Sequence, residues 1–63
     1  MSKMWHGDAI VKLKNAGFSV VEMNHNAGVY ASKNGRVYSI MKNGTFFDKE
    51  NVDKIIKDEN NAS

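Results

Sequence analysis

The sequence predicts an α+β fold: a helix, a three-stranded antiparallel meander and a second helix, with both helices on one face of the sheet. Three observations predict it. Apolar residues recur at helical spacing near both ends of the chain, and they alternate with polar residues in its middle. Two Asn-Gly pairs, which favour tight hairpin turns, occur at 34–35 and 43–44. The 63 residues suffice for one small domain, 1–63, with an ordered core at about 8–57 and a polar end, 58–63, that is expected to fray.

Both helices have recognisable ends. The first is expected at about 8–16, because Asp8 can accept hydrogen bonds from the first turn and Gly17 offers the left-handed conformation that stops a helix. Its apolar stripe consists of Ile10, Leu13 and Ala16, with Val11 beside them. The second is expected at about 49–58, where Asp48 caps its first turn. Its apolar stripe consists of Val52, Ile55 and Ile56.

The strands are predicted by β-branched and aromatic residues between turn residues. They are expected at 18–23, 28–33 and 36–42. Asn24-His25-Asn26 forms the turn between the first two strands, and Asn34-Gly35 forms the hairpin between the last two. Asn43-Gly44 is a second hairpin signal, which leads into a short edge strand at 45–47.

The turn geometry assigns side chains to the two faces of the sheet. A two-residue turn at Asn34-Gly35 places Ala31 opposite Tyr38 and Val29 opposite Ile40, all on one face. The core under the helices is therefore expected to contain Phe18, Val20, Val29, Ala31, Tyr38, Ile40 and Phe47. A register slip of one residue would exchange the two faces and leave an equally apolar face exposed.

The face away from the helices is predicted to be apolar, although a solvated sheet face is normally polar. Its large side chains are expected to be Val21, Met23, Tyr30, Val37, Met41 and Phe46. A contiguous apolar patch usually marks an interface. We therefore expect this face to pair with a second copy of the chain, as a homodimer, or to be covered by a different protein.

The composition excludes several classes of protein. The absence of cysteine excludes a disulfide framework, a thiol nucleophile and a cysteine-based metal site. His6 and Asp8 are too few ligands for a metal site, no phosphate-binding glycine loop is present, and no cofactor is expected. The sequence contains no membrane span and no signal-peptide core, so a cytoplasmic location is expected.

The basic residues are concentrated in the first three quarters of the chain. Residues 1–47 contain six basic and two acidic side chains, whereas residues 48–63 contain three and five. The candidates for contacts with the phosphate backbone of RNA or DNA are Lys12, Lys14, Lys33, Arg36 and Lys42. Reversing the charges of Lys33 and Arg36, beside the first hairpin tip, is expected to remove such binding and to leave the fold intact.

Four segments resemble the HicA-type toxins, small mRNA interferases with a double-stranded-RNA-binding-like fold. They are residues 13–21 (LKNAGFSVV), Val29-Tyr30, Asn34-Gly35-Arg36 and residues 52–57 (VDKIIK). The resemblance implies the helix–three strands–helix fold and a nucleic-acid-binding role. The catalytic histidine of the family lies just before the Val-aromatic pair, where this chain has Ala27 and Gly28.

His25 lies two residues too early for that catalytic position, on the expected turn. It is the one candidate for a displaced general base, and a solvated turn histidine is the alternative. No nucleophile–base pair accompanies it, so the sequence favours a protein that is not an enzyme.

Two functions follow from these observations. The first is a non-catalytic nucleic-acid-binding module that resembles the HicA-type toxins of toxin–antitoxin systems. The second is a small inhibitor or regulator, of the kind that phages encode against host proteins, which docks through its apolar sheet face. Salt dependence distinguishes them, because phosphate contacts weaken steeply with salt and apolar docking does not.

Overall fold

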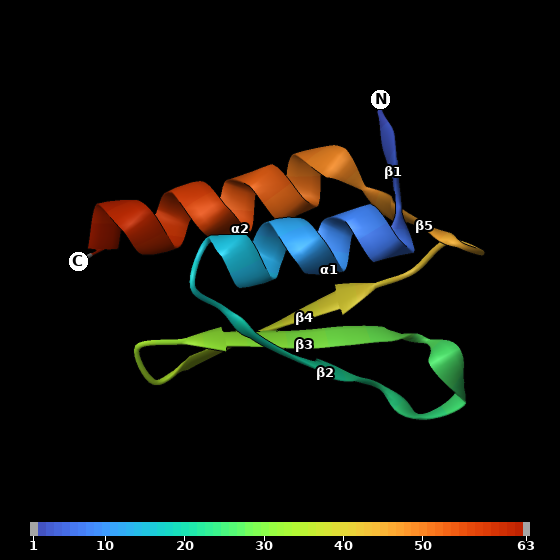
Figure 1. Cartoon of the computed structure of the whole chain (residues 1–63), viewed down its shortest axis with the longest axis horizontal. Coiled ribbons are helices and arrows are strands. Elements are labelled where there is room, and N and C mark those ends of the chain that lie inside the picture. The colour runs from blue at the N-terminus through green and yellow to red at the C-terminus, as the bar shows by residue number, and fades with distance from the viewer. Residues whose placement is uncertain (1, 63) are drawn as a thin grey trace.

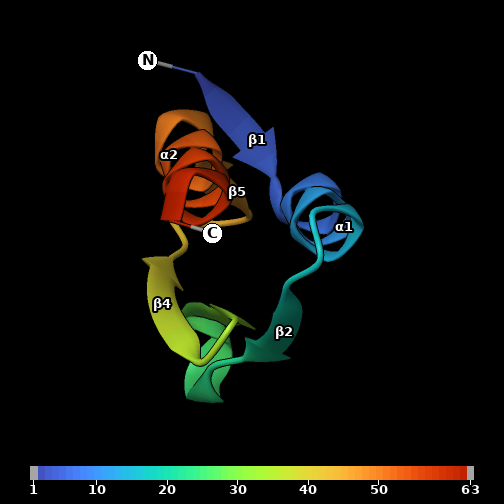
Figure 2. The same ribbon diagram turned by 90° about the vertical axis from the view of Figure 1, so that its left-hand side faces the viewer.

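The computed structural model describes residues 2–62, which form two layers (Figure 1). The elements, in chain order, are β1 (Lys3–Trp5), α1 (His6–Asn15), β2 (Ser19–Glu22), the 3-10 turn η1 (Asn24–Asn26), β3 (Gly28–Lys33), β4 (Arg36–Met41), β5 (Phe46–Asp48) and α2 (Lys49–Ala62). Strands β2, β3 and β4 form an antiparallel sheet in that order. Both helices lie on one face of this sheet, with β2 below α1 and β4 below α2 (Figure 2). The predicted α+β fold is confirmed.

The register of the sheet is the one that the hairpin turn predicts. Ala31 pairs with Tyr38 and Val29 with Ile40, across a turn in which both Asn34 and Gly35 have positive φ angles, 55° and 81°. Two central residues with φ above zero define the type I′ turn that Asn-Gly favours. The sheet therefore takes the predicted register, and the alternative with exchanged faces is excluded.

The hydrophobic core lies between the helices and the inner face of the sheet. It consists of Ala9, Leu13, Phe18, Val29, Ala31, Ile40, Phe47 and Val52. Most of the core residues that were predicted from the sheet are buried here. The two exceptions, Val20 and Tyr38, are half-buried and pack against the cluster. Ile10, Ala16, Ile55 and Ile56 also pack against it, as predicted. Val11, expected beside the stripe of the first helix, is exposed instead.

Helix α1 ends as predicted and begins earlier than predicted. Gly17 has a φ of 94° and lies just past the helix, in the conformation that only glycine adopts without strain. The helix begins at His6, and no side chain caps it, so the expected capping role of Asp8 is wrong. Asp8 lies inside the first turn instead, where its charge still suits the helix dipole. The His6 backbone N–H donates to the Thr45 carbonyl at 2.9 Å, so a neighbouring loop satisfies a group that a cap would otherwise serve.

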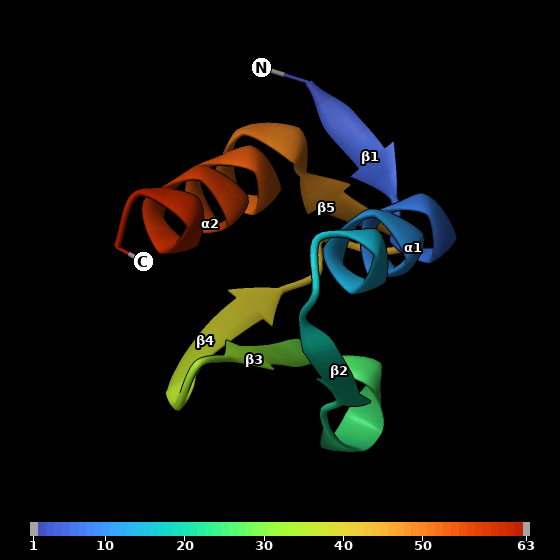
Figure 3. The same ribbon diagram turned by 60° about the vertical axis from the view of Figure 1, so that its left-hand side comes forward.

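The short strand after the second Asn-Gly pair does not extend the sheet. Asn43 and Phe46 close a tight turn on themselves, with N···O distances of 2.8 and 3.2 Å. The chain then leaves the sheet, and β5 pairs with the N-terminal strand β1, with Met4 opposite Phe47 (Figure 3). The expectation of an edge strand beside β4 is wrong, because β1 provides the backbone partner.

Helix α2 starts directly after Asp48, as predicted, but it continues to Ala62. The expectation that it ends near residue 58, with a frayed end at 58–63, is wrong for the described residues, because Glu59 is only 1% exposed. Glu59 accepts hydrogen bonds from two side chains of β4, and these fasten the last turns of the helix to the sheet. Ser63 lies outside the described residues.

Neither described helix is long and apolar enough to cross a membrane.

Candidate functional site

The outer face of the sheet, which we define by Val21, Tyr30, Val37 and Met41, is apolar and open. These side chains are 62%, 44%, 66% and 63% exposed. Tyr30 lies on the central strand, opposite Val21 on one side and Ser39 on the other. Along the strands, the residues between them on this face are Ser19, Ser32 and Ser39. The face therefore has no charged side chain.

One of the six residues predicted for this face lies elsewhere, and a second lies at its margin. Phe46 belongs to β5, where it lies opposite Trp5 in the two-stranded sheet. The prediction for Phe46 is wrong because β5 pairs with β1 and not with β4. Met23 follows the end of β2, is half-buried and is not part of the core cluster. It lies at the margin of the outer face.

Arg36 has an intramolecular partner. Its guanidinium donates to Glu59 Oε2 at 2.8 Å, and the Tyr38 hydroxyl donates to Glu59 Oε1 at 3.1 Å. Burial of the hydroxyl, together with the hydrogen bond to Glu59, raises the pKa of Tyr38 above its usual range. A buried carboxylate needs such partners, because an unpaired charge in the interior is costly. Charge reversal at Arg36 would therefore act on the fold, contrary to the expectation from the sequence that the change buries nothing.

Lys33 also serves the fold. Its Nζ donates to the carbonyl of Ala16 at 2.7 Å, just past the end of α1, and lies 5.6 Å from the centre of the Phe18 ring. The carbonyls at the end of a helix have no intrahelical partner, and a lysine there satisfies one of them and suits the helix dipole. The side chain reaches this carbonyl by passing Gly17, whose missing Cβ leaves room for it.

Lys12 and Lys42 have partners too. Lys12 forms an ion pair with Asp53 of α2, and Lys49 donates to the same carboxylate at 3.0 Å. The hydrogen bonds from Lys12 and then Lys49 hold the pKa of Asp53 below its usual range. Lys42 Nζ donates to the side-chain oxygen of Asn26 at 2.6 Å.

Lys14 is the remaining candidate for a phosphate contact. It is exposed on α1, and within residues 2–62 it has no hydrogen bond or ion pair. Four of the five cations are thus bound to other groups of the chain. Lys33 and Arg36 lie opposite each other beside the β3–β4 turn, and Lys12 and Lys14 both lie on α1.

His25 lies where the sequence placed it, on the turn before β3. It is exposed, and both His25 and Asn26 adopt left-handed backbone conformations, with φ angles of 61° and 58°. Two consecutive non-glycine residues in this region store strain, which the contact between Lys42 and Asn26 helps to hold. No acid, base or nucleophile contacts the imidazole within the described residues, so the geometry offers it no catalytic partner.

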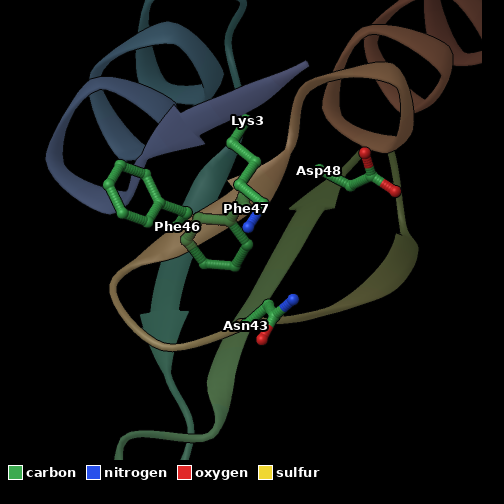
Figure 4. Close-up of a pocket in the computed structure, with 5 residues that line it drawn as sticks. All are labelled: Lys3, Asn43, Phe46, Phe47 and Asp48. Atoms are coloured by element: carbon green, nitrogen blue, oxygen red, sulfur yellow. The ribbon is translucent and has the colours of Figure 1, made fainter. Parts of the chain in front are cut away.

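A small pocket of about 150 Å³ lies at the β1–β5 pair, away from the outer face. It is lined by Lys3, Asn43, Phe46, Phe47 and Asp48. Figure 4 shows the Lys3 side chain extending toward the ring of Phe47. Its lining contains no histidine and no hydroxyl side chain, and its titratable groups are Lys3 and Asp48, which lie opposite each other in the β1–β5 pair. Across residues 2–62, no three His, Asp or Glu side chains gather as a metal site would require.

The buried carboxylate of Glu59 was not among the residues predicted to matter for this region. A signal for it exists, because position 59 continues the helical spacing of Val52, Ile55 and Ile56. A glutamate at that place predicts a buried charge that needs a cation, and Arg36 meets that need.

No family model, no curated protein and no solved structure matches the chain. The resemblance to the HicA-type toxins therefore stays a prediction from the four sequence segments.

Proposed function

We propose that this chain is a small, non-catalytic protein of the cytoplasm that regulates or inhibits another protein. It binds that protein through its outer sheet face. The observation that carries the proposal is the exposure of Val21, Tyr30, Val37 and Met41 on adjacent strands with no charge among them. Four such side chains present on the order of 400 Å² of accessible surface, the size of the largest apolar patch on a typical monomer, which is often functional.

The mode of binding follows from the chemistry of the face. Burial of apolar side chains provides the free energy, while the serines and the Tyr30 hydroxyl offer hydrogen bonds that fix the orientation of the partner. The matching surface on the partner is apolar and uncharged at its centre, because a charge placed there would be desolvated without an ion pair.

Photo-crosslinking in the native cells tests the proposal. A photoreactive p-benzoylphenylalanine replaces Tyr30 in one variant and Val11, an exposed apolar residue of α1, in a control. We expect the label at position 30 to capture one defined protein that the label at position 11 does not capture. Capture of no other protein at position 30, or of the same proteins at both positions, would contradict the proposal.

Nucleic-acid binding is the second candidate, and the isoelectric point of about 9.1 and the unpaired Lys14 favour it. It is less well supported, because four of the five candidate cations are bound to groups of the chain itself. Titration of structured and single-stranded RNA at rising salt tests it. RNA binding that weakens steeply with salt and is lost in Lys14→Glu would favour it, and RNA cleavage that is lost in His25→Ala would assign an enzyme.

A further inference from the structure

We propose that a second copy of this chain covers the outer sheet face when the partner protein is absent. The free protein is then a two-fold symmetric dimer whose docking surface is closed, and the partner binds by displacing one copy. This inference rests on the proposed function, since both occupants use the same surface.

Charge complementarity favours a second copy as the occupant. A two-fold interface brings the same surface patch of each chain together, so any charge in the patch meets its own copy. The outer face carries apolar side chains and serines alone, so two copies meet without like charges at the centre. The chain has a net charge of +2, but its cations are distributed over other parts of the molecule.

The area is sufficient for a dimer, but not for a permanent one. The serines and the margin around the four large side chains extend the surface that pairing covers, so two copies together bury on the order of 1,000 Å², near the lower limit of specific interfaces. An interface of this size belongs to the weak, transient class. Such a dimer protects the apolar face in concentrated solution and still yields to a partner that binds more tightly.

The register fixes the centre of the interface. Tyr30 lies on the middle strand, between Val21 and Ser39, so face-to-face pairing about the centre of the face brings the two Tyr30 rings close together. Two sheets that pack in this way are about 10 Å apart, a separation that side chains of this size fill. The Tyr30 hydroxyl needs a hydrogen-bond partner when buried, and the outer-face serines of the other copy supply one.

Sedimentation equilibrium on three proteins tests the inference. Val37→Glu places a charge on the outer face, and Val11→Glu makes the same change at a valine that is 56% exposed on α1, in the helix layer. We expect the wild type and Val11→Glu to dimerise equally, and the dimer Kd of Val37→Glu to rise by at least about tenfold, because a charge is then buried unpaired. A wild type that is monomeric up to about 1 mM would overturn the inference, and so would equal effects of the two variants.

Disulfide crosslinking distinguishes the outer sheet face from the helix layer and does not depend on the folding of a charged variant. The chain has no cysteine, so Ser39→Cys, next to Tyr30, and Asn51→Cys, on the exposed side of α2, each introduce a single thiol. Mild oxidation is expected to crosslink Ser39→Cys rapidly and Asn51→Cys slowly. Equal rates would overturn the face-to-face arrangement.

The two proposals fail in different ways. If the wild type is monomeric and the label at position 30 captures a different protein in cells, the dimer is wrong and the proposed function stands. If the wild type forms a dimer that Val37→Glu weakens and the label captures this chain alone, the dimer stands and the role as a regulator of another protein is wrong.

Discussion

The two faces of the β2–β3–β4 sheet are built from the same strands and are similarly apolar, but only one is covered. Val29, Ala31 and Ile40 of the inner face are buried beneath the helices. Tyr30 and Met41, their immediate neighbours in sequence, are exposed on the outer face. Hydrophobic patterning alone therefore does not show which face forms the core, because that depends on which face the two helices cover. The outer-face side chains do not belong to the buried core, and this is why we propose that they bind a partner.

The largest difference between the faces is expected when a core side chain is truncated. Leu13→Ala removes a fully buried side chain and should cost about 3 kcal/mol or more, most of the stability of a domain this small. Met41→Ala on the outer face should leave the unfolding free energy of the monomer nearly unchanged. Urea denaturation at low protein concentration, followed by circular dichroism, measures both. Similar losses would show that the two faces do not differ in the way we describe.

The second-largest loss of stability is expected at the ion pair between Arg36 and Glu59, on the side of the sheet that the helices cover. Arg36→Ala removes the charged partner of the buried Glu59 carboxylate, so the variant is expected to lose about 1–3 kcal/mol. Lys14→Ala, the control, removes a cation with no partner among the described residues and should change stability by less than about 0.5 kcal/mol. If Arg36→Ala were as stable as the control, the ion pair would have no structural role.

A smaller effect depends on pH. Lys12 and Lys49 lower the pKa of Asp53 in the folded state, so the unfolded chain takes up the proton more readily. The contribution of Asp53 to stability is thus present above its unfolded pKa of about 3.9 and disappears as the pH falls through the lower folded value. The stability difference between wild type and Asp53→Asn should be constant at neutral pH and shrink in acid below pH 4 or so. A difference that grows in acid would contradict this assignment.

The smallest effect on stability is expected on the outer face itself. Val37→Glu exchanges an exposed valine for an exposed charge, so the melting temperature of the dilute monomer should differ little from that of the wild type. Thermal denaturation at low micromolar concentration provides the measurement. A large loss in the monomer would show that Val37 supports the fold, and the outer face could not then be assigned to binding alone.

Local signals in the sequence predicted most of the fold. The Asn34-Gly35 turn fixed the register of the hairpin, and Gly17 fixed the end of α1, because each depends on backbone conformations that few residues adopt. Alternation along β3 and β4 then assigned each side chain to a face.

Contacts between distant segments could not be predicted. β1 forms a strand because β5 lies beside it, and the three residues of β1 carry no strand signal that would have been decisive alone. Because β5 pairs with β1, Phe46 does not lie on the outer face. For a similar reason, the sequence could not show that Lys12 and Arg36 have intramolecular partners, because Asp53 and Glu59 lie far along the chain, on α2. Charge in a sequence shows which residues are cations, not which of them are already paired.

Oxidative footprinting by mass spectrometry tests most directly whether a protein surface covers the outer face. Met41 on the outer face and Trp5 on β1 are both exposed and oxidisable, so Trp5 serves as an internal control in the same molecule. We predict that Met41 becomes protected from hydroxyl radicals as the protein concentration rises or when an extract of the native cells is added, while the reactivity of Trp5 stays constant. Equal reactivity of Met41 under all of these conditions would contradict the proposal that a protein surface covers the outer face.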